Sequence, residues 1–374
     1  MTVPDRVGDG PLDLRLDDLV DHHCHGLLTR DLERAEFESL MNEAPGPAPL
    51  GTTLFDSMLG LAVRRHCAPV LDLEPLAPAA DYLRRRLDLG GAEVNRRLMA
   101  ATGIGTLLVD TGLGPADLCG PDQVAALSGG TAHEVVRLER LAEQVVASGS
   151  DDVAGEILQR LTAARDAGAV GAKSIAAYRV GLALAATKPS DDDLRRALPG
   201  VDPTRIADPV VSAWLAHTAL ETGLPLQFHV GYGDKDVDLL TCDPLRLTPF
   251  LRATEERGVP VLLLHCYPFH RHASYLAQVF GHVFMDLGLA THNTGALSAT
   301  LLREALELVP FGKLLFSTDA YALAELYLLG AVLFRRGFGV VVDELLDAGD
   351  LREDDADRLA ALVARENAAR AYGL

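Results

Sequence analysis

The histidine pair His23 and His25 ends an apolar run, and its spacing suits metal binding. In an extended strand, residues two apart point to the same side. Both imidazoles can therefore reach one ion, with nitrogens about 2.0–2.1 Å from a zinc. The pair taken alone fits a hydrogen-bonded polar strand end equally well.

Three further polar residues each follow a separate apolar run: His229 after PLQF, His265 after PVLLL and Asp319 after KLLFST. In a parallel barrel the carboxyl ends of all strands lie on one face, so these side chains would converge with the histidine pair. Imidazoles and a carboxylate suit zinc, with manganese, iron or nickel as alternatives. A core polar group is the alternative for each residue singly, and the convergence argues against it for the set.

Lys173 interrupts the apolar segment AVGAKSIAAYR. Burial lowers the pKa of a lysine and makes its amine nucleophilic. Such an amine can capture carbon dioxide, which gives a carbamate whose two oxygens bridge two metal ions. Two alternatives stay open: Lys173 binds the substrate as a cation, or it is a structural lysine paired with a carboxylate.

Substrate contacts are predicted from the polar residues that come next along the chain. Tyr178 and Arg179 follow Lys173, and an arginine there can clamp a substrate carboxylate through two parallel hydrogen bonds. A surface arginine at a helix start is the alternative. His292 follows the apolar run at 283–287 and is a further candidate for the mouth of the site, whereas Cys24 is expected to pack in the core.

The elements that must position these residues alternate between short apolar runs and longer amphipathic stretches, which is typical of β/α units. Expected strands lie at 19–24, 105–110, 169–175, 225–228, 260–264, 283–287 and 313–317, with a weaker one at 135–138. Expected helices lie at 208–222, 249–258, 298–308, 322–336 and 351–372. The pattern predicts one α/β domain over 1–374, a TIM (β/α)8 barrel.

Residues 30–100 do not follow the alternation, because several helical segments and a proline-rich turn precede the second strand. We interpret this stretch as a helical insertion after strand 1, over the barrel mouth where active sites are built. A separate small helical domain is the alternative.

Composition excludes several classes of protein. The 374 residues are 48% hydrophobic and carry a net charge of −19, so the chain can bury a core but repels nucleic-acid phosphates and anionic lipid. Five cysteines do not form a disulfide framework, and no signal peptide is visible. We therefore expect a cytoplasmic protein with a small-molecule partner, and we leave a homo-oligomer open.

The combined order of these motifs resembles the amidohydrolase superfamily. The segments DHHCHG, GAKSIAAYRVGL, LQFHVGYGD and LLFSTDAY are similar to an amidohydrolase-related group of TIM-barrel metal hydrolases, and to the amidohydrolase half of nodulin/glutamine-synthetase-like fusion proteins. The resemblance runs from residue 20 to about 322. It implies metal ligation by His23, His25, His229 and Asp319.

The resemblance leaves the number of ions open. In members with two metals, the residues matching Lys173 and His265 complete a second site. In members with one metal, the residue matching His265 positions the substrate. We therefore predict one or two divalent ions, with zinc first, and a carboxylated Lys173 in the two-metal case.

The expected activity is metal-dependent hydrolysis of a small amide or ester that carries a carboxylate, with Asp319 and His265 as the catalytic pair. A metal-dependent decarboxylase or a uronate-isomerase-like enzyme is the alternative, since both need a Lewis acid and a proton shuttle. A binding protein without chemistry is disfavoured, because none of the expected ligand positions is replaced.

Overall fold

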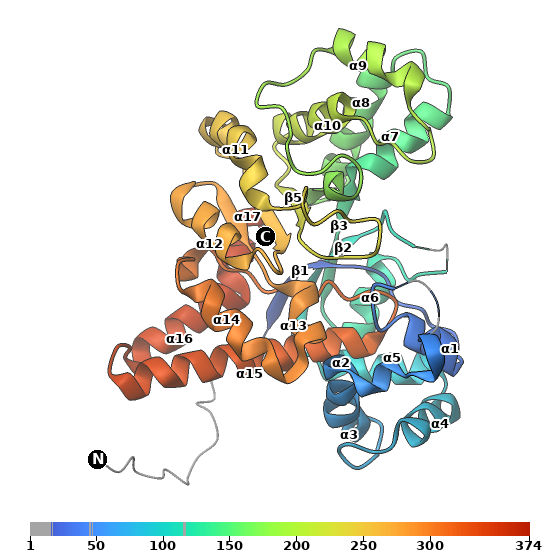
Figure 1. Cartoon of the computed structure of the whole chain (residues 1–374), viewed down its shortest axis with the longest axis vertical. Helices are drawn as coiled ribbons and strands as arrows, with labels where there is room; N and C mark the ends of the chain where they lie inside the picture. Colours follow the sequence, from blue (N-terminus) through green and yellow to red (C-terminus); the bar gives the residue numbers. More distant parts are fainter. Residues whose placement is uncertain (1–15, 17, 45, 47, 115–116) are drawn as a thin grey trace.

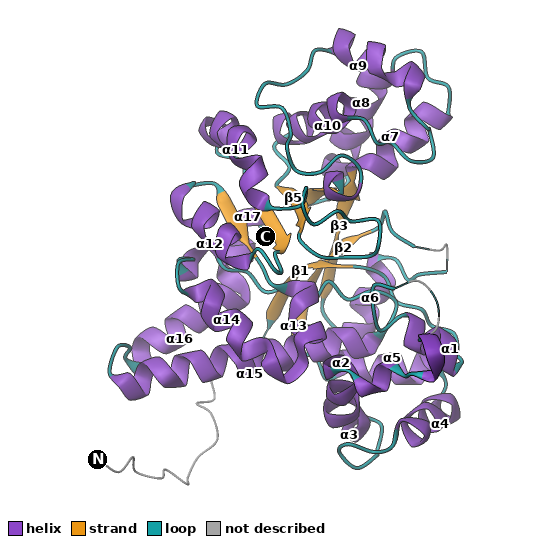
Figure 2. Cartoon of the chain, viewed as in Figure 1, coloured by secondary structure: helices purple, strands orange, loops and turns teal. Residues whose placement is uncertain are grey.

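The computed structural model describes residues 16, 18–44, 46, 48–114 and 117–374. Its centre is a curled parallel sheet of seven strands, each paired with the next along the chain. Figure 2 shows the strands gathered in the middle of the molecule with helices around them. The strands are β1 (Leu19–Cys24), β2 (Ile104–Asp110), β3 (Thr131–Arg137), β4 (Gly171–Ser174), β5 (Leu226–Val230), β6 (Val261–His265) and β7 (Val283–Met285). This is a TIM-barrel-like α/β fold.

The eighth strand expected at 313–317 is not present as a regular strand, which corrects the sequence prediction. The segment still lies between β7 and β1. Leu315 N–H donates to Met285 at 2.9 Å, and His22 N–H donates to Phe316 at 3.2 Å. The next amide, of Thr318, bonds to the side chain of Asp21 at 2.9 Å instead of to a backbone carbonyl, so no continuous ladder forms.

Helices fill the connections between the strands, as the alternating pattern predicts (Figure 1). Between β2 and β7 they are α6 (Pro121–Ser128), α7 (Leu138–Ala147), α8 (Val153–Asp166), α9 (Asp191–Ala197), α10 (Pro209–Glu221), α11 (Thr248–Thr254) and α12 (His270–Val279). After β7 they are α13 (Gly288–Thr294), α14 (Ser298–Leu306), α15 (Ala324–Ala348), α16 (Glu353–Ala361) and α17 (Asn367–Tyr372).

In the described part of the segment between β1 and β2, the structure has five α-helices. They are α1 (Arg34–Ser39), α2 (Met58–Ala62), α3 (Ala68–Val70), α4 (Ala79–Leu89) and α5 (Gly91–Ala100). Their buried residues belong to the same core cluster as the strands. Buried Arg86 and Tyr82 of α4 both donate to Glu325 of α15 at 2.9 Å, so this segment is held against the long helix.

The long helix α15 continues beyond the end at Arg336 that the sequence predicts, because Gly337 does not break it. A Cβ atom at Gly337 would lie 2.6 Å from Leu302 of α14. The glycine therefore allows two helices to pack closely and is not a stop signal. Among the described residues, no helix combines the length and apolar character needed to span a bilayer.

A second, smaller core cluster lies inside the curl of the sheet. It joins Val20, Leu108, Val135 and other strand residues to Ala368, Ala371 and Tyr372 of α17. The last helix thus packs against the strands themselves, while the main core lies between the sheet and its outer helices. All five cysteines are buried and unpaired, Cys24 among them.

Candidate metal centre

The predicted site residues lie together at the carboxyl ends of the strands. His23 belongs to β1 and His25 follows it, while His229 and His265 lie at the ends of β5 and β6. All four histidines are buried. In the register of the β5–β6 pair, His265 lies beside Val230, one residue past His229, so the two rings are neighbours with centroids 4.8 Å apart.

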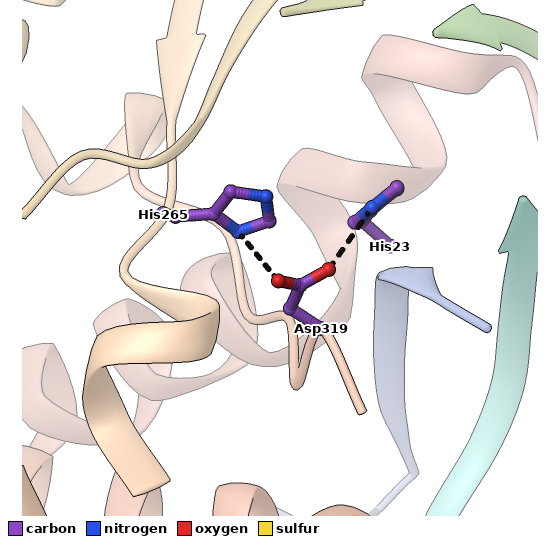
Figure 3. A group of neighbouring side chains, drawn as sticks. All are labelled: His23, His265 and Asp319. Carbon is purple, nitrogen blue, oxygen red and sulfur yellow. Dashed lines mark ion pairs between the residues drawn. The ribbon is translucent and has the colours of Figure 1, made fainter. Parts of the chain in front are cut away.

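Asp319 is the residue on which three of the histidines converge. Its Oδ1 lies 3.2 Å from His23 Nε2 and 3.3 Å from His25 Nε2, and its Oδ2 lies 3.4 Å from His265 Nδ1. Figure 3 shows His23 and His265 facing this carboxylate from opposite sides. Burial would raise the pKa of Asp319, but His265, His23 and His25 hold it well below its usual range.

His23 and His25 present lone pairs to this point, because hydrogen bonds occupy their other nitrogens. His23 Nδ1–H donates to Gln227 Oε1 at 2.8 Å, and His25 Nδ1–H donates to the Asp110 carbonyl at 3.3 Å. Burial, with Lys173 nearby, lowers the pKa of His23 to about 3. Neutral imidazoles with the outer nitrogen tied to the protein are the form that binds metal ions.

His229 supplies a further nitrogen without a hydrogen bond. Its buried Nε2 has no hydrogen-bond partner among the described residues. Two groups have all their ligating atoms within 4.8 Å of one another: His23, His265 and Asp319, and His23, His25 and Asp110. The donor set and the unpartnered nitrogen therefore fit a divalent ion held by imidazole and carboxylate.

Lys173 lies directly beside these groups. Its Nζ is 3.1 Å from His23 Nε2, and within the described residues no carboxylate oxygen lies at ion-pair distance from it. Burial lowers the pKa of Lys173 to about 8, against the opposing effect of Asp110 and Asp319. The alternative of a structural lysine paired with a carboxylate therefore has no partner in the described part of the chain.

A pocket of about 560 Å³ opens over the cluster and contains the predicted substrate contacts. The Tyr178 ring packs on His229 with centroids 4.4 Å apart. His292 is buried on α13, and burial lowers its pKa to about 4. Arg179 lies 3.4 Å from Glu143, but its buried Nε has no partner within the described residues. Only part of the Arg179 guanidinium therefore forms an ion pair, and its Nε–H remains available to a ligand.

Among the pocket residues that were not predicted from the sequence are the charged residues Arg137 and Glu43. Arg137 ends β3 as the register partner of Lys173 and forms a buried ion pair with Asp110. Glu43 lies between α1 and α2, and burial, together with Asp319 and Asp234, raises its pKa to about 7. The sequence signal for Arg137 was weak, because it is a charged residue within the less certain of the expected strands, at 135–138.

Two buried aspartates that support the site were also missed. Asp21 accepts hydrogen bonds from the backbone and hydroxyl of Thr318, next to Asp319. Asp286 accepts from the backbone N–H of His265 at 2.9 Å. Asp21 lies in the segment DHHCHG and Asp286 directly follows β7, but only the fold shows that each hydrogen-bonds to a segment from another strand.

A TIM-barrel-like fold with histidines and an aspartate gathered at its strand ends defines a class of metal-dependent enzymes. The family comparison is consistent with it. Residues 137–374, more than half of the chain, match the sequence model of the amidohydrolase family. The chain belongs to the amidohydrolase family and is an enzyme of the hydrolase type.

Three relatives extend this result. The protein fluG of Emericella nidulans is 29% identical over 404 residues, which cover 95% of this chain but 46% of that protein. The chain thus spans less than half the length of this relative. The structure of a candidate metal-dependent hydrolase from Lactobacillus casei ATCC 334 has a TM-score of 0.82, with 29% identity over 98% of both chains. Uronate isomerase of Thermotoga maritima, 13% identical over 95% of this chain and 94% of its own, shares the fold with a TM-score of 0.64.

Proposed function

We propose that this enzyme hydrolyses a small amide or ester that carries a carboxylate, and that it uses one or two divalent ions, zinc first. The observation that carries the proposal is the contact of Asp319 with His23, His25 and His265. Three imidazoles and a carboxylate in a buried pocket are a donor set for a borderline cation. The relative from Lactobacillus casei supports the same class of reaction.

His23, His25, His229 and Asp319 would hold the first ion, and Lys173, carboxylated, with His265 would hold a second. When bound, a divalent ion polarises a carbonyl and brings the pKa of water from 15.7 toward about 7. Asp319 is ionised at neutral pH, so it accepts the proton of the attacking water and passes it to the leaving group. With one ion, His265 positions the scissile carbonyl instead.

The substrate carboxylate is assigned to Arg179, with Tyr178 and His292 as neighbouring walls of the pocket. The unpartnered Nε of Arg179 supports this assignment. Arg179→Lys keeps the charge but loses the planar fork, so we expect KM to rise about tenfold with kcat little changed. Steady-state kinetics of this variant, with Arg165→Lys on the surface as control, test the assignment. An unchanged KM would contradict it.

We also propose that the helical segment 30–100 is an insertion that covers the mouth of the pocket. The supporting observation is that Leu40, Met41 and Glu43 line the pocket beside His229 and His265. The shared core with the strands argues against a separate helical domain.

Metal analysis and a substrate screen test the proposed function. The purified protein should contain a divalent ion, and His23→Ala with His25→Ala should lose both the ion and the activity. The matched control is His133→Ala, a histidine of β3 that does not line the pocket. Full metal content in the double variant would refute the site.

The screen should offer amides, esters, lactones, carboxylic acids and uronates to the metal-reconstituted enzyme. Turnover of amides or esters supports hydrolysis. Turnover of uronates or decarboxylation of acids, without any hydrolysis, would replace it with the lyase or isomerase alternative.

A further inference from the structure

A buried network of hydrogen bonds links α17 to the candidate metal ligand His23. The amide nitrogen of Gln227 donates to the Tyr372 hydroxyl at 2.7 Å and to the His22 carbonyl at 2.8 Å. The other end of the same amide, Oε1, accepts the Nδ1–H of His23 at 2.8 Å. All of these residues are buried.

The direction of each hydrogen bond follows from the partners. A rotated Gln227 amide would place its oxygen against the His22 carbonyl, with two acceptors facing each other. The amide is therefore fixed with Oε1 toward His23, which makes His23 Nδ1 the donor. The remaining nitrogen of His23, Nε2, then carries a lone pair, and it lies 3.2 Å from Asp319 Oδ1.

A second branch of the network reaches His265. The Tyr372 hydroxyl lies 2.9 Å from His22 Nδ1, and His22 Nε2 lies 2.8 Å from Asp286 Oδ2. The other oxygen of Asp286 accepts the backbone N–H of His265. The Tyr372 hydroxyl accepts from Gln227 and has one hydrogen to donate, which we assign to His22 Nδ1, and His22 Nε2–H donates to the carboxylate of Asp286. The Tyr372 hydroxyl thus belongs to the hydrogen-bond chains that reach both His23 and His265.

The fold holds this hydroxyl in place. Tyr372 packs in the inner core cluster with Val20, Leu108 and Leu262. Its ring lies against the start of β4, where a Cβ on Gly171 would be only 3.1 Å from Tyr372 Cε1. Figure 1 shows α17 against the strands at the centre of the molecule. The ring position is therefore set by strand packing, independently of the hydroxyl.

We propose that Tyr372 is a positioning residue for the metal centre. Its hydroxyl, together with the His22 carbonyl, holds the amide of Gln227, and the amide fixes the tautomer and orientation of His23. The inference rests on the proposed role of His23 as a ligand. Phenylalanine at 372 would keep the ring but remove one of the two acceptors of Gln227 Nε2 and leave His22 Nδ1 without its partner. The amide would then be held by the His22 carbonyl alone, and His23 would be oriented less firmly.

The test measures binding of Co²⁺ to the metal-free protein by calorimetry and by the visible absorption of the bound ion. Outer partners of metal-binding histidines typically contribute 10–100-fold in affinity, so Tyr372→Phe should weaken Co²⁺ binding about tenfold. Gln227→Ala should weaken it at least as much. If Tyr372 acts through Gln227, the double variant should be no weaker than Gln227→Ala alone.

The matched control is Tyr82→Phe, which removes another buried hydroxyl, bonded to Glu325 and outside the network. It should bind Co²⁺ like the wild type, even where its melting temperature falls. Wild-type affinity in Tyr372→Phe, or strictly additive losses in the double variant, would overturn the inference. Failure of the wild-type protein itself to bind Co²⁺ would instead overturn the proposed function.

Discussion

At the scale of single residues, the site depends on backbone conformations that are costly elsewhere. His265 and Asp319 have φ values of 67° and 50°, in the left-handed region that non-glycine residues rarely adopt. Each such residue costs roughly 1–3 kcal/mol, and surrounding contacts must maintain it. Asp286 binds the amide of His265, and the His23 carbonyl accepts the amide of Asp319 at 2.9 Å. Asp286 and the backbone of β1 therefore hold His265 and Asp319 in these conformations.

Lys173 gives a prediction at the same scale. With a pKa near 8, part of this amine is neutral at pH 7–8, as carbamate formation requires. If the carbamate bridges two ions, Lys173→Ala should lose activity that short carboxylic acids partly restore, and Lys173→Arg should be inactive. If the lysine only contacts substrate, Lys173→Arg should keep the metal and raise KM.

Metal content and kcat, measured with and without acetate and bicarbonate, separate these outcomes. Lys188→Ala, a lysine that pairs with Glu221 at the surface, is the control and should behave like the wild type. Unrescued Lys173→Ala with full metal content would exclude the two-metal form.

At the scale of elements, Glu139 joins α7 to β4 through hydrogen bonds, and its effect on the free energy of unfolding depends on pH. One carboxylate oxygen accepts from Ser174 and from the amide of Ile175, and the other is buried with no hydrogen-bond partner among the residues that the structure describes. Burial raises the pKa of Glu139 above its usual range. The folded protein thus binds this proton more tightly than the unfolded chain, so stability is lost as pH rises from the unfolded pKa through the folded one.

Glu139→Gln should remove that loss, because glutamine keeps an acceptor for Ser174 and carries no charge. Melting temperatures at pH 5 and pH 8 should fall less with pH in the variant than in the wild type. Glu156→Gln on neighbouring α8 is the control, since Ser150 and Arg160 lower the pKa of that exposed carboxyl. An unchanged pH dependence in Glu139→Gln would show that this group does not set it.

At the scale of the whole molecule, the core and not an ion is expected to supply most of the stability. Both core clusters are built from buried apolar residues of strands and helices, and a chain of this length buries most of its surface. Removal of the metal with a chelator should therefore abolish activity but leave one cooperative unfolding transition. The free energy of unfolding should fall only by the contribution of metal binding, about 4 kcal/mol at a thousandfold excess over Kd, and the melting temperature should fall accordingly.

Calorimetry with and without chelator, followed by addition of Zn²⁺, is the measurement. Loss of the transition in the metal-free protein would contradict the prediction and would make the ion structural.

The sequence by itself determined most of the order of elements and predicted which polar residues lie together at the strand ends. The strand 19–24 was predicted at both of its ends, and His23, His25, His229, His265 and Asp319 were predicted to lie together because each follows an apolar run. Parallel strands bring such positions to one face, so local pattern was sufficient there. The helix end at Arg336 was wrong, because the pattern cannot show that Gly337 packs against α14.

Only the tertiary structure decided which polar groups serve the site from a distance. Tyr372 lies 145 residues from Gln227 in sequence, and Asp21 lies 297 residues from Thr318. Their spacing carries no period, because these hydrogen bonds form only after strands and helices have packed. The eighth strand was lost for the same reason: the Asp21 side chain takes the amide that a regular ladder would have used. Periodicity reports which face of an element is buried, whereas such contacts depend on which elements meet.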